Sequence, residues 1–336
     1  MAGTSTGVLA TGSYLPDEEV TNADVAKKVS VTAEWIEERT LIRARRYAAP
    51  DQATSDLAAL AAKSALERGG IAADDLAYLI VSTSTGDFPL PPTAYLVQDA
   101  IGARRAACMD INVVCSGFVY GVAVARALLA TRPDGYALVV AADLYSRSLD
   151  YDDFRSSILF GDGAGAVVLG PVPPGYGILE VDLASRGDEH HLIRIEAGGS
   201  RQPSSAETVA AGGHYVRMEG HRVRDFVLAE VPPALRRLVT QAGFEIGQVD
   251  HFVPHQPNGI LLGKLAERLD VPRSRVHLTL DKYANVGSAS VPVTLDDANR
   301  SGALNDGDLV LMTAFGGGMA IGSCLLRWAA RTEKEA

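Results

Sequence analysis

The chain has 336 residues, of which 47% are apolar and 21% are charged, and its formal net charge at pH 7 is −10. This composition predicts a globular protein with a substantial core, built as one large α/β domain or two modest ones. The negative charge argues against nucleic acid or an anionic membrane as a partner. No secretory signal is expected at the N-terminus, and no apolar run reaches the roughly eighteen residues of a membrane span.

The three cysteines, Cys108, Cys115 and Cys324, are odd in number and far apart in the chain. They predict neither a disulfide framework nor a metal site, and they favour a reduced, cytoplasmic protein. Cys108 and Cys324 lie in strand-like runs, where a free cysteine is usually a small buried hydrophobe.

Helical and strand-like segments alternate along the chain, which predicts mixed or parallel sheets with helices outside them. The run 55–69 has helical spacing, and a strand is expected within 70–83. Cys115 comes next, in DINVVCSGFVYGVAVARALL, where an apolar β-branched run ends and helical spacing begins. A thiol at the first turn of a helix lies near unpaired N–H groups, which favour the thiolate and lower its pKa. Cys115 is therefore a candidate nucleophile.

The stretch FGDGAGAVVLG (160–170) has glycines spaced as in a dinucleotide-binding loop. Strand-like residues follow it where that loop needs a helix, so nicotinamide binding is not expected. The glycines are expected instead to allow close packing beside the cysteine loop.

The second half of the chain repeats the first. Residues 70–83 match 243–256 at a shift of 173, and residues 116–140 match 288–312 at a shift of 172. The repeat predicts two similar α/β halves, packed back to back as layered sheets that share helices. The halves are 1–171 and 172–336, with a linker at 171–177 and an insertion at 197–213.

His255 follows the apolar strand of the second half, at a strand end, where α/β proteins commonly bind ligands. The shift pairs Cys115 with Gly287, two residues after Asn285 in YANVGSASVP. A thiol of one half is therefore expected to face an imidazole and an amide of the other. Taken singly, His255 also fits a hydrogen-bonded core histidine, and Asn285 fits a turn residue.

Taken together, these stretches resemble the β-ketoacyl-acyl-carrier-protein synthase III family of the thiolase fold. The resemblance covers essentially the whole chain and implies a layered α-β-α-β-α architecture of two duplicated halves. The motifs that carry it, in order, are WIEERTLIRARRYAAP (35–50), CSGFVYG (115–121), FGDGAG (160–165), VPHQPN (253–258), YANVGSASVP (283–292) and AFGGG (314–318).

The resemblance implies that Cys115, His255 and Asn285 form the active site. The cysteine would take an acyl group from acyl-CoA, and a malonyl thioester on an acyl carrier protein would then lose CO₂ and attack it. His255 and Asn285 would hold the enolate oxygen, and the backbone N–H groups of Cys115 and Gly317 would hold the later oxyanion. CoA thioesters are substrates here, so neither a metal nor another cofactor is implied.

The resemblance also assigns residues to CoA. Trp35 and Arg39 lie four apart on a predicted helix, so they share a face and are expected to sandwich the adenine. Their alternative is a half-buried tryptophan beside a surface arginine in an ion pair. Arg155 and Asn258 are implied as further CoA contacts, with Arg155 one residue closer to FGDG than the family's arginine.

Two phenylalanines are implied at the acyl tunnel. Phe160 belongs to the FGDG stretch, and Phe88 resembles a gate residue that reaches across a homodimer interface into the neighbouring tunnel. The alternative for Phe88 is that it covers the core edge of its own subunit.

Two positions depart from the family pattern. Leu41 stands where the family usually has glycine, which is expected to reshape the CoA mouth. Ile260 stands where well-known members carry an arginine that docks the acidic carrier protein, with Lys264 and Arg268 nearby as substitutes. Weak docking suits a priming enzyme with its own carrier protein, or an enzyme that passes the acyl group elsewhere.

The predicted function is decarboxylative condensation of an acyl-CoA starter with malonyl-carrier protein, in fatty-acid or polyketide chain initiation. The alternative is acyl transfer from CoA to a hydroxyl or amine of a natural product, with His255 as general base. A third hypothesis is a degenerate paralogue that only binds acyl-CoA.

Overall fold

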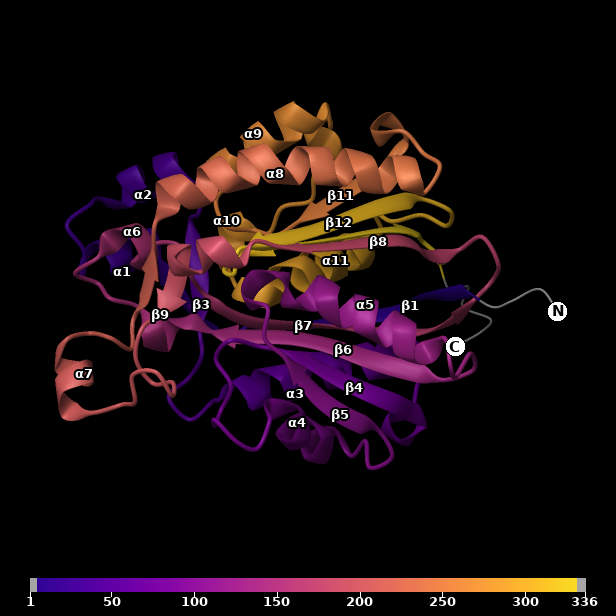
Figure 1. The fold of residues 1–336 in the computed structure, drawn as a ribbon, viewed down its shortest axis with the longest axis horizontal. Coiled ribbons are helices and arrows are strands. Elements are labelled where there is room, and N and C mark those ends of the chain that lie inside the picture. Colours follow the sequence, from indigo (N-terminus) through magenta and orange to yellow (C-terminus); the bar gives the residue numbers. More distant parts are fainter. Residues whose placement is uncertain (1–4, 331–336) are drawn as a thin grey trace.

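Two mixed sheets with helices on both faces make up the fold of the computed structural model, which describes residues 5–330. Figure 1 shows the layers in the order α, β, α, β, α, with α3 and α4 on one outer face and α8 and α9 on the other. This arrangement confirms the predicted fold class. Within residues 5–330, no helix is long and apolar enough to cross a membrane.

The first sheet has the strand order β1-β7-β6-β4-β5. Strand β4 pairs in parallel with β5 and β6, whereas β7 pairs antiparallel with β1 and β6. The strands are β1 (Ser5–Tyr14), β4 (Leu76–Ser82), β5 (Ala107–Ile111), β6 (Tyr136–Leu144) and β7 (Asp162–Val172).

The second sheet has the order β11-β12-β13-β8, in which only the β11–β12 pair is parallel. At the edge beyond β11, Val276 makes a single bridge to Phe252 where the first sheet has the whole strand β5. The strands are β8 (Gly177–Ser185), β11 (His251–Pro254), β12 (Leu309–Gly316) and β13 (Ala320–Arg327).

Several elements of the two sheets recur at the sequence shift seen above. Strands β6 and β12 begin at Tyr136 and Leu309, and short 3₁₀ turns cover 114–116 and 287–289. Each turn leads directly into a central helix. The exact boundary between the halves, at 171/172, stays a prediction.

The two central helices, α5 (Gly117–Leu129) and α11 (Ser290–Arg300), each contact both sheets. Helix α5 buries a broad apolar face that includes Phe118, Val119 and Val122, as expected for a helix between two layers. The outer helices are α3 (Thr54–Gly69), α4 (Thr93–Ile101), α8 (Gly220–Gln241) and α9 (Gly259–Leu269).

The glycines of the FGDG stretch serve a different contact from the one predicted. A Cβ at Gly161 would lie 2.7 Å from the carbonyl oxygen of Tyr283, and one at Gly165 would lie 2.8 Å from the nitrogen of Val293. These glycines therefore bring the chain around β7 against the segment that carries Asn285, and not against the cysteine loop.

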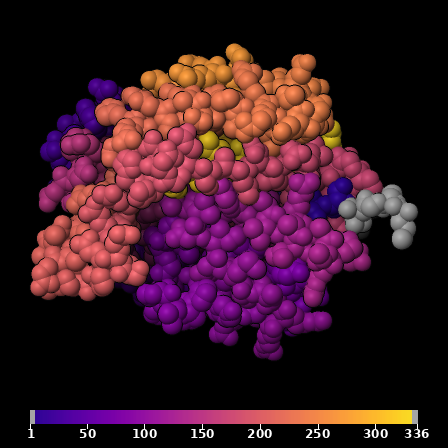
Figure 2. Space-filling model, viewed as in Figure 1, coloured from indigo at the N-terminus to yellow at the C-terminus, as the bar shows by residue number. Residues whose placement is uncertain are grey.

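The shorter elements lie mostly at one end of the layers, at the left of Figure 1. The predicted insertion, 197–213, contains α7 and stands out from the body in Figure 2. The shorter elements are β2 (Glu18–Thr21), α1 (Asn22–Ala26), α2 (Ala33–Thr40), β3 (Ala44–Tyr47), α6 (Phe154–Ser157), β9 (Ile193–Ile195), α7 (Ala206–Ala210), β10 (Val216–Met218) and α10 (Leu280–Tyr283).

Candidate active site

Cys115 lies on the turn between β5 and α5, as the sequence predicts. The preceding residue, Val114, has φ +46°, a left-handed conformation that a β-branched side chain rarely adopts. Strain of this kind costs on the order of 1–3 kcal/mol and persists where the surroundings impose it. Strand β12 and the turn 287–289 both pack against the Cys115 turn and hold Val114 in this conformation.

The Cys115 thiol is buried, and its protonation differs from the prediction. Burial raises the pKa of the Cys115 thiol well above its usual range, and the negative charge of Asp143 raises it further. A backbone hydrogen bond at the turn lowers the pKa by less. The start of the helix alone therefore does not make this cysteine a thiolate.

His255 is held at the end of β11 by its backbone N–H, which donates to the Thr313 carbonyl oxygen over 2.7 Å. Its ring meets Phe315 edge-on, with the ring centroids 5.6 Å apart. Burial lowers the pKa of His255 to about 3, so the imidazole is neutral at pH 7. Its Nδ1 has no hydrogen-bond partner within residues 5–330.

The neighbouring Gln256 fixes the chain around His255. Its Nε2 donates to the carbonyl oxygens of Pro254 and His277, and its Oε1 accepts from the N–H groups of Thr279 and Leu280. Gln256 belongs to the VPHQPN stretch (253–258) but was not predicted as a site residue.

Asn285 is oriented by three hydrogen bonds of 2.9 Å. Its N–H donates to the Leu159 carbonyl oxygen, and its own carbonyl oxygen accepts from Gly161. Its side-chain Oδ1 accepts from the N–H of Gly287. Since Oδ1 is occupied, the side-chain NH₂ is the group left to act as a donor.

The end of β12, just before the glycine-rich turn, lies directly against Cys115. A Cβ at Gly316 would lie 2.7 Å from the Cβ of Cys115 and 3.1 Å from its Sγ. A Cβ at Gly317 would instead meet Val114, at 3.2 Å. The role of Gly317 as an oxyanion donor stays a prediction, and Gly316 is the closer neighbour of the thiol.

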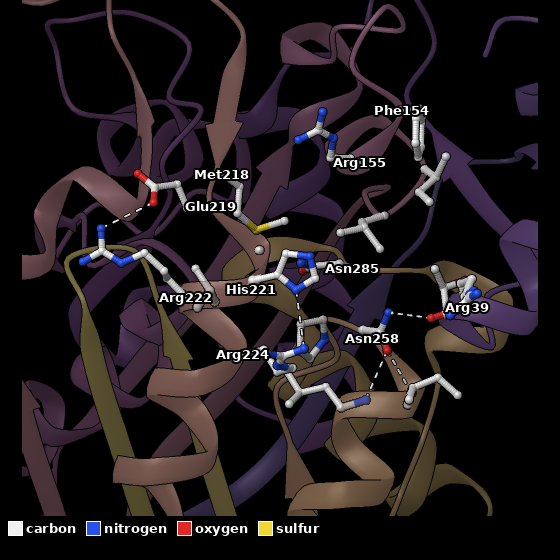
Figure 3. Close-up of a pocket in the computed structure, with 18 of the residues that line it drawn as sticks. Arg39, Phe154, Arg155, Met218, Glu219, His221, Arg222, Arg224, Asn258 and Asn285 are labelled. Carbon is white, nitrogen blue, oxygen red and sulfur yellow. Dashed lines mark hydrogen bonds and ion pairs between the residues drawn. The ribbon is translucent and has the colours of Figure 1, made fainter. Parts of the chain in front are cut away.

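A groove of about 790 Å³ reaches Asn285, which Figure 3 shows on its wall, whereas Cys115 and His255 are not among the residues that line it. Trp35 and Arg39 both line it, with the guanidinium carbon of Arg39 5.8 Å from the centre of the Trp35 ring. Phe154 packs edge-on against Trp35, with the ring centroids 5.6 Å apart. The predicted pair therefore lies together on one wall of this groove.

Asn258 and Arg155 also line the groove, but with different constraints. Asn258 caps α9 by accepting from Ile260 and Leu261, and it donates to the carbonyl oxygen of Arg39 over 3.0 Å. Its side chain is therefore largely engaged within the protein. The Arg155 side chain is 82% exposed and lies 3.8 Å from Asp153.

The two predicted tunnel residues lie in different surroundings. Phe160 is buried, packs against Tyr145 with the two rings tilted and their centroids 4.8 Å apart, and forms a β-bridge with Asn285. Phe88 is 57% exposed and lines a second, smaller pocket of about 370 Å³ together with Ile195. Within this single chain, Phe88 does not cover its own core.

One wall of the groove was not anticipated from the sequence. It is formed where β10 leads into α8, by residues that include a histidine and two arginines, and Figure 3 shows them opposite Arg39. They are Met218, Glu219, Gly220, His221, Arg222, Val223 and Arg224. Within residues 5–330, no cluster of three or more His, Cys, Asp or Glu side chains is arranged to hold a metal ion.

Comparison with known proteins identifies the family. Residues 109–187 match the family model for 3-oxoacyl-[acyl-carrier-protein] synthase III, and residues 239–328 match the model for its C-terminal part. A β-ketoacyl-[acyl-carrier-protein] synthase III of Desulfitobacterium hafniense (strain DSM 10664 / DCB-2) is 42% identical over 97% of this chain and 99% of its own length. The chain belongs to the synthase III family.

Two of the other relatives have names that differ from synthase III. Acetoacetyl CoA synthase NphT7 of Streptomyces sp. (strain CL190) is 45% identical over 96% of this chain and 98% of its own length. The solved priming β-ketosynthase of the R1128 polyketide pathway is 32% identical, with a TM-score of 0.91 and 99% of each chain covered. The synthase III structure from Aquifex aeolicus VF5 is 33% identical, with a TM-score of 0.89, covering 96% of this chain and 100% of its own.

The departure at Leu41 has a visible consequence. Leu41 ends α2 with φ +61°, the left-handed region that favours glycine. A Cβ at Gly259 would lie 2.8 Å from the Leu41 side chain, so Leu41 fills the space beside the Asn258 cap. Packing of Leu41 between α2 and the start of α9 therefore comes with backbone strain at Leu41.

Proposed function

We propose that the protein loads an acyl group from acyl-CoA onto Cys115 and extends it by decarboxylative condensation with malonyl-carrier protein. The proposal rests on the contact between the Cys115 turn and the turn 287–289. Asn285, just before the second turn, also lines the groove. The family to which the chain belongs consists of condensing enzymes, which agrees with this chemistry.

The steps follow from these groups. The Cys115 sulfur attacks the thioester carbonyl carbon, the carbon–sulfur bond to CoA breaks, and CoA leaves with the thiol proton. The malonyl thioester then loses CO₂, and its enolate oxygen is held by the Asn285 NH₂ and a neutral His255 N–H. The carbanion attacks the acyl carbon, and the backbone N–H groups of Cys115 and Gly317 hold the oxyanion. The oxyanion then collapses to the ketone, and the Cys115 sulfur leaves as a thiolate that takes a proton from solvent. CoA thioesters are the substrates, and the chemistry uses no further cofactor.

The test is mass spectrometry of the intact protein after incubation with a panel of acyl-CoA thioesters, followed by addition of malonyl-carrier protein. We expect an acyl adduct that is lost as a β-ketoacyl product forms, and no adduct on Cys115→Ala. An adduct that resists malonyl thioesters but transfers to an alcohol or amine would support the alternative acyltransferase. CoA binding without any adduct would support the non-catalytic paralogue.

A second candidate is the same condensation with malonyl-CoA as the extender, and the charges at the groove mouth favour it. Arg222 pairs with Glu189 and Glu219, and Arg224 pairs with Asp225. The two arginines of this wall are therefore charge-compensated, which leaves them little to offer an acidic carrier protein.

Neighbouring residues add to this argument. Helix α2 exposes Glu34, Glu37 and Glu38 beside the groove, and Ile260 is 40% exposed on α9. Arg268 donates to the Leu228 carbonyl oxygen and is partly engaged. Arg39 and Lys264 have no carboxylate partner within residues 5–330 and line the groove itself, where CoA phosphates would reach them. A relative named acetoacetyl CoA synthase points the same way.

The two extenders are separated by giving the acylated enzyme malonyl-CoA or malonyl-carrier protein at equal concentrations. The second candidate predicts β-ketoacyl-CoA as the main product, and it predicts that Ile260→Arg increases use of the carrier protein. Turnover with the carrier protein alone would rule this candidate out and leave the first.

We further propose that each chain consists of the halves 1–171 and 172–336, and that two such chains form a cytoplasmic homodimer. Strand β5 is an edge strand of the first sheet, and such an edge offers unpaired N–H and C=O groups to a second copy. Phe88, Leu90 and Tyr95 are exposed apolar side chains in the segment that precedes β5. An isologous dimer would cover them and bring Phe88 to the neighbouring acyl tunnel. Sedimentation of the native protein tests this assembly.

A further inference from the structure

Asp143 is a fully buried carboxylate at the end of β6, with no Lys, Arg or His within ion-pair distance in the described part of the chain. A buried charge without a counter-ion is costly unless hydrogen bonds replace its hydration. Here five donors do so. Oδ1 accepts from the Ser84 N–H at 2.8 Å and from the hydroxyls of Thr83 and Thr85 at 3.3 and 3.5 Å. Oδ2 accepts from the N–H and the hydroxyl of Ser288, at 2.7 and 2.8 Å.

The Oδ2 side of this carboxylate leads to Asn285. Ser288 belongs to the turn 287–289, and the N–H of Gly287 in the same turn donates to Asn285 Oδ1. Gly287 has φ +58°, and a Cβ there would overlap the Asp143 carboxylate. The turn thus lies directly on Asp143, and its position sets where the Asn285 amide points.

The Oδ1 side leads to the Phe88 loop. Thr83, Ser84 and Thr85 continue β4 into that loop, and the Thr85 hydroxyl also accepts from the Leu144 N–H over 2.8 Å. Farther along, Asp87 accepts from the N–H and hydroxyl of Ser55 at 2.9 and 2.6 Å. Asp143 therefore fixes the base of the loop that carries Phe88.

We propose that Asp143 is a positioning residue that joins the two halves of the active site, orienting the Asn285 amide for the condensation step while anchoring the base of the Phe88 loop. This inference rests on the proposed function, because it assigns Asn285 to the enolate. It separates the two half-reactions: condensation depends on the Asp143 carboxylate, whereas acyl loading onto Cys115 does not need the Asn285 amide.

The charge of Asp143 provides an independent signature. The titratable groups that it influences are Cys115 and Tyr145, and in both cases its negative charge raises the pKa. Removing the charge should therefore make the Cys115 thiol easier to ionise. A loosened fold would also lower the pKa of the thiol by exposing it, so the shift is assigned to the charge only when it appears in Asp143→Asn and not in Ser288→Ala, which retains the charge.

The variant is Asp143→Asn, which keeps the shape but replaces one acceptor oxygen by an NH₂. That NH₂ cannot accept from the backbone N–H of either Ser84 or Ser288, so one of the two loops loses its partner. We expect condensation to fall by about tenfold or more, as when an oxyanion donor is misplaced, and loading to change by less than about threefold. The pH profile of Cys115 alkylation by iodoacetamide should shift to lower pH.

Two further variants complete the test. Asp296→Asn is the matched control, because Asp296 is equally buried and accepts from Thr11, Ser13 and Arg68, away from the site. It should not change the ratio of condensation to loading, nor the alkylation profile. Ser288→Ala removes one donor and retains the charge, so it should lower condensation without shifting alkylation, and it carries the test should Asp143→Asn fail to fold.

The outcomes are distinct. Loading and condensation that fall in parallel in Asp143→Asn or Ser288→Ala, as in a generally weakened protein, would overturn the positioning role. An alkylation profile that is unchanged in folded Asp143→Asn would overturn the influence of its charge on the thiol. A native enzyme that loads acyl groups but never condenses them would refute the proposed function itself, before any variant is compared.

Discussion

Substitution of Gly316 by alanine tests the packing around the thiol. Gly316 is buried at the end of β12, and an added Cβ would lie 2.7 Å from the Cβ of Cys115 and 3.3 Å from its backbone nitrogen. The shorter of these distances is about 0.7 Å below the 3.4 Å at which ordinary contact begins. Neither neighbouring atom is the end of a flexible side chain, so the turn that carries the thiol has to move.

The expected losses of stability and of activity differ in size. Overpacking a core by one methyl group costs about 1–3 kcal/mol. For a chain of 336 residues this corresponds to a fall in Tm of roughly 1–4 °C. A catalytic group displaced by about 1 Å loses on the order of 100-fold in rate. Gly316→Ala should therefore remain folded while acyl loading falls by one to two orders of magnitude.

The assay pairs thermal unfolding with the rate of acyl-enzyme formation measured by mass spectrometry. Gly263→Ala is the control, since Gly263 lies inside α9 and a Cβ there meets nothing within 4 Å. That substitution should stabilise the protein by about 0.5–1 kcal/mol and leave loading unchanged. If Gly316→Ala loads acyl groups at the native rate, this account of the turn is wrong.

Three other predictions concern the groove, the loop and the histidine. Arg39→Ala should raise KM for acyl-CoA by about tenfold, as for a lost charge-assisted contact. Loading from an acyl-N-acetylcysteamine thioester, which lacks the nucleotide, should not change. An equal loss with both acyl donors would contradict CoA binding by Arg39. Phe88→Ala should broaden starter preference toward bulkier acyl groups in the loading panel, and an unchanged profile would refute its role as a gate. The fold lowers the pKa of His255 from 6.5 to about 3, so the unfolded chain binds a proton first and stability is lost as pH falls below 6.5. The Tm of His255→Gln should therefore fall less between pH 7 and pH 5 than that of the native protein, and an equal fall would argue against a buried neutral imidazole.

Local sequence patterns predicted the elements that carry the candidate site. The change from β-branched residues to helical spacing placed Cys115 immediately before α5, because strand and helix periodicity are properties of short segments. The internal repeat predicted that a turn around Gly287 would face the Cys115 turn, and the two turns do pack together. Since both halves are built alike, equivalent turns meet near one axis.

Long-range contacts were not predictable in this way. The raised pKa of Cys115 depends on its burial and on Asp143, which comes from β6. A signal was present, because Asp143 interrupts the otherwise apolar strand YALVVAADL, and an acid in such a run is buried and needs donors. The groove wall at 218–224 follows the insertion, where no periodic pattern relates it to Trp35 and Arg39.

Burial shifts the pKa values of Cys115 and His255 in opposite directions, and both shifts favour the neutral form of the side chain. It raises the pKa of the thiol and lowers that of the imidazole to about 3, so both groups are neutral at pH 7. A thiolate–imidazolium pair would place two charges in a buried site, and the nearby negative charge of Asp143 opposes the thiolate further. A neutral imidazole keeps an N–H to donate, and Asn285 contributes a second donor whose direction is fixed by Gly287. In the proposed mechanism, charge that develops on the enolate oxygen would therefore meet dipoles already in place, an arrangement that stabilises such charge with little reorganisation.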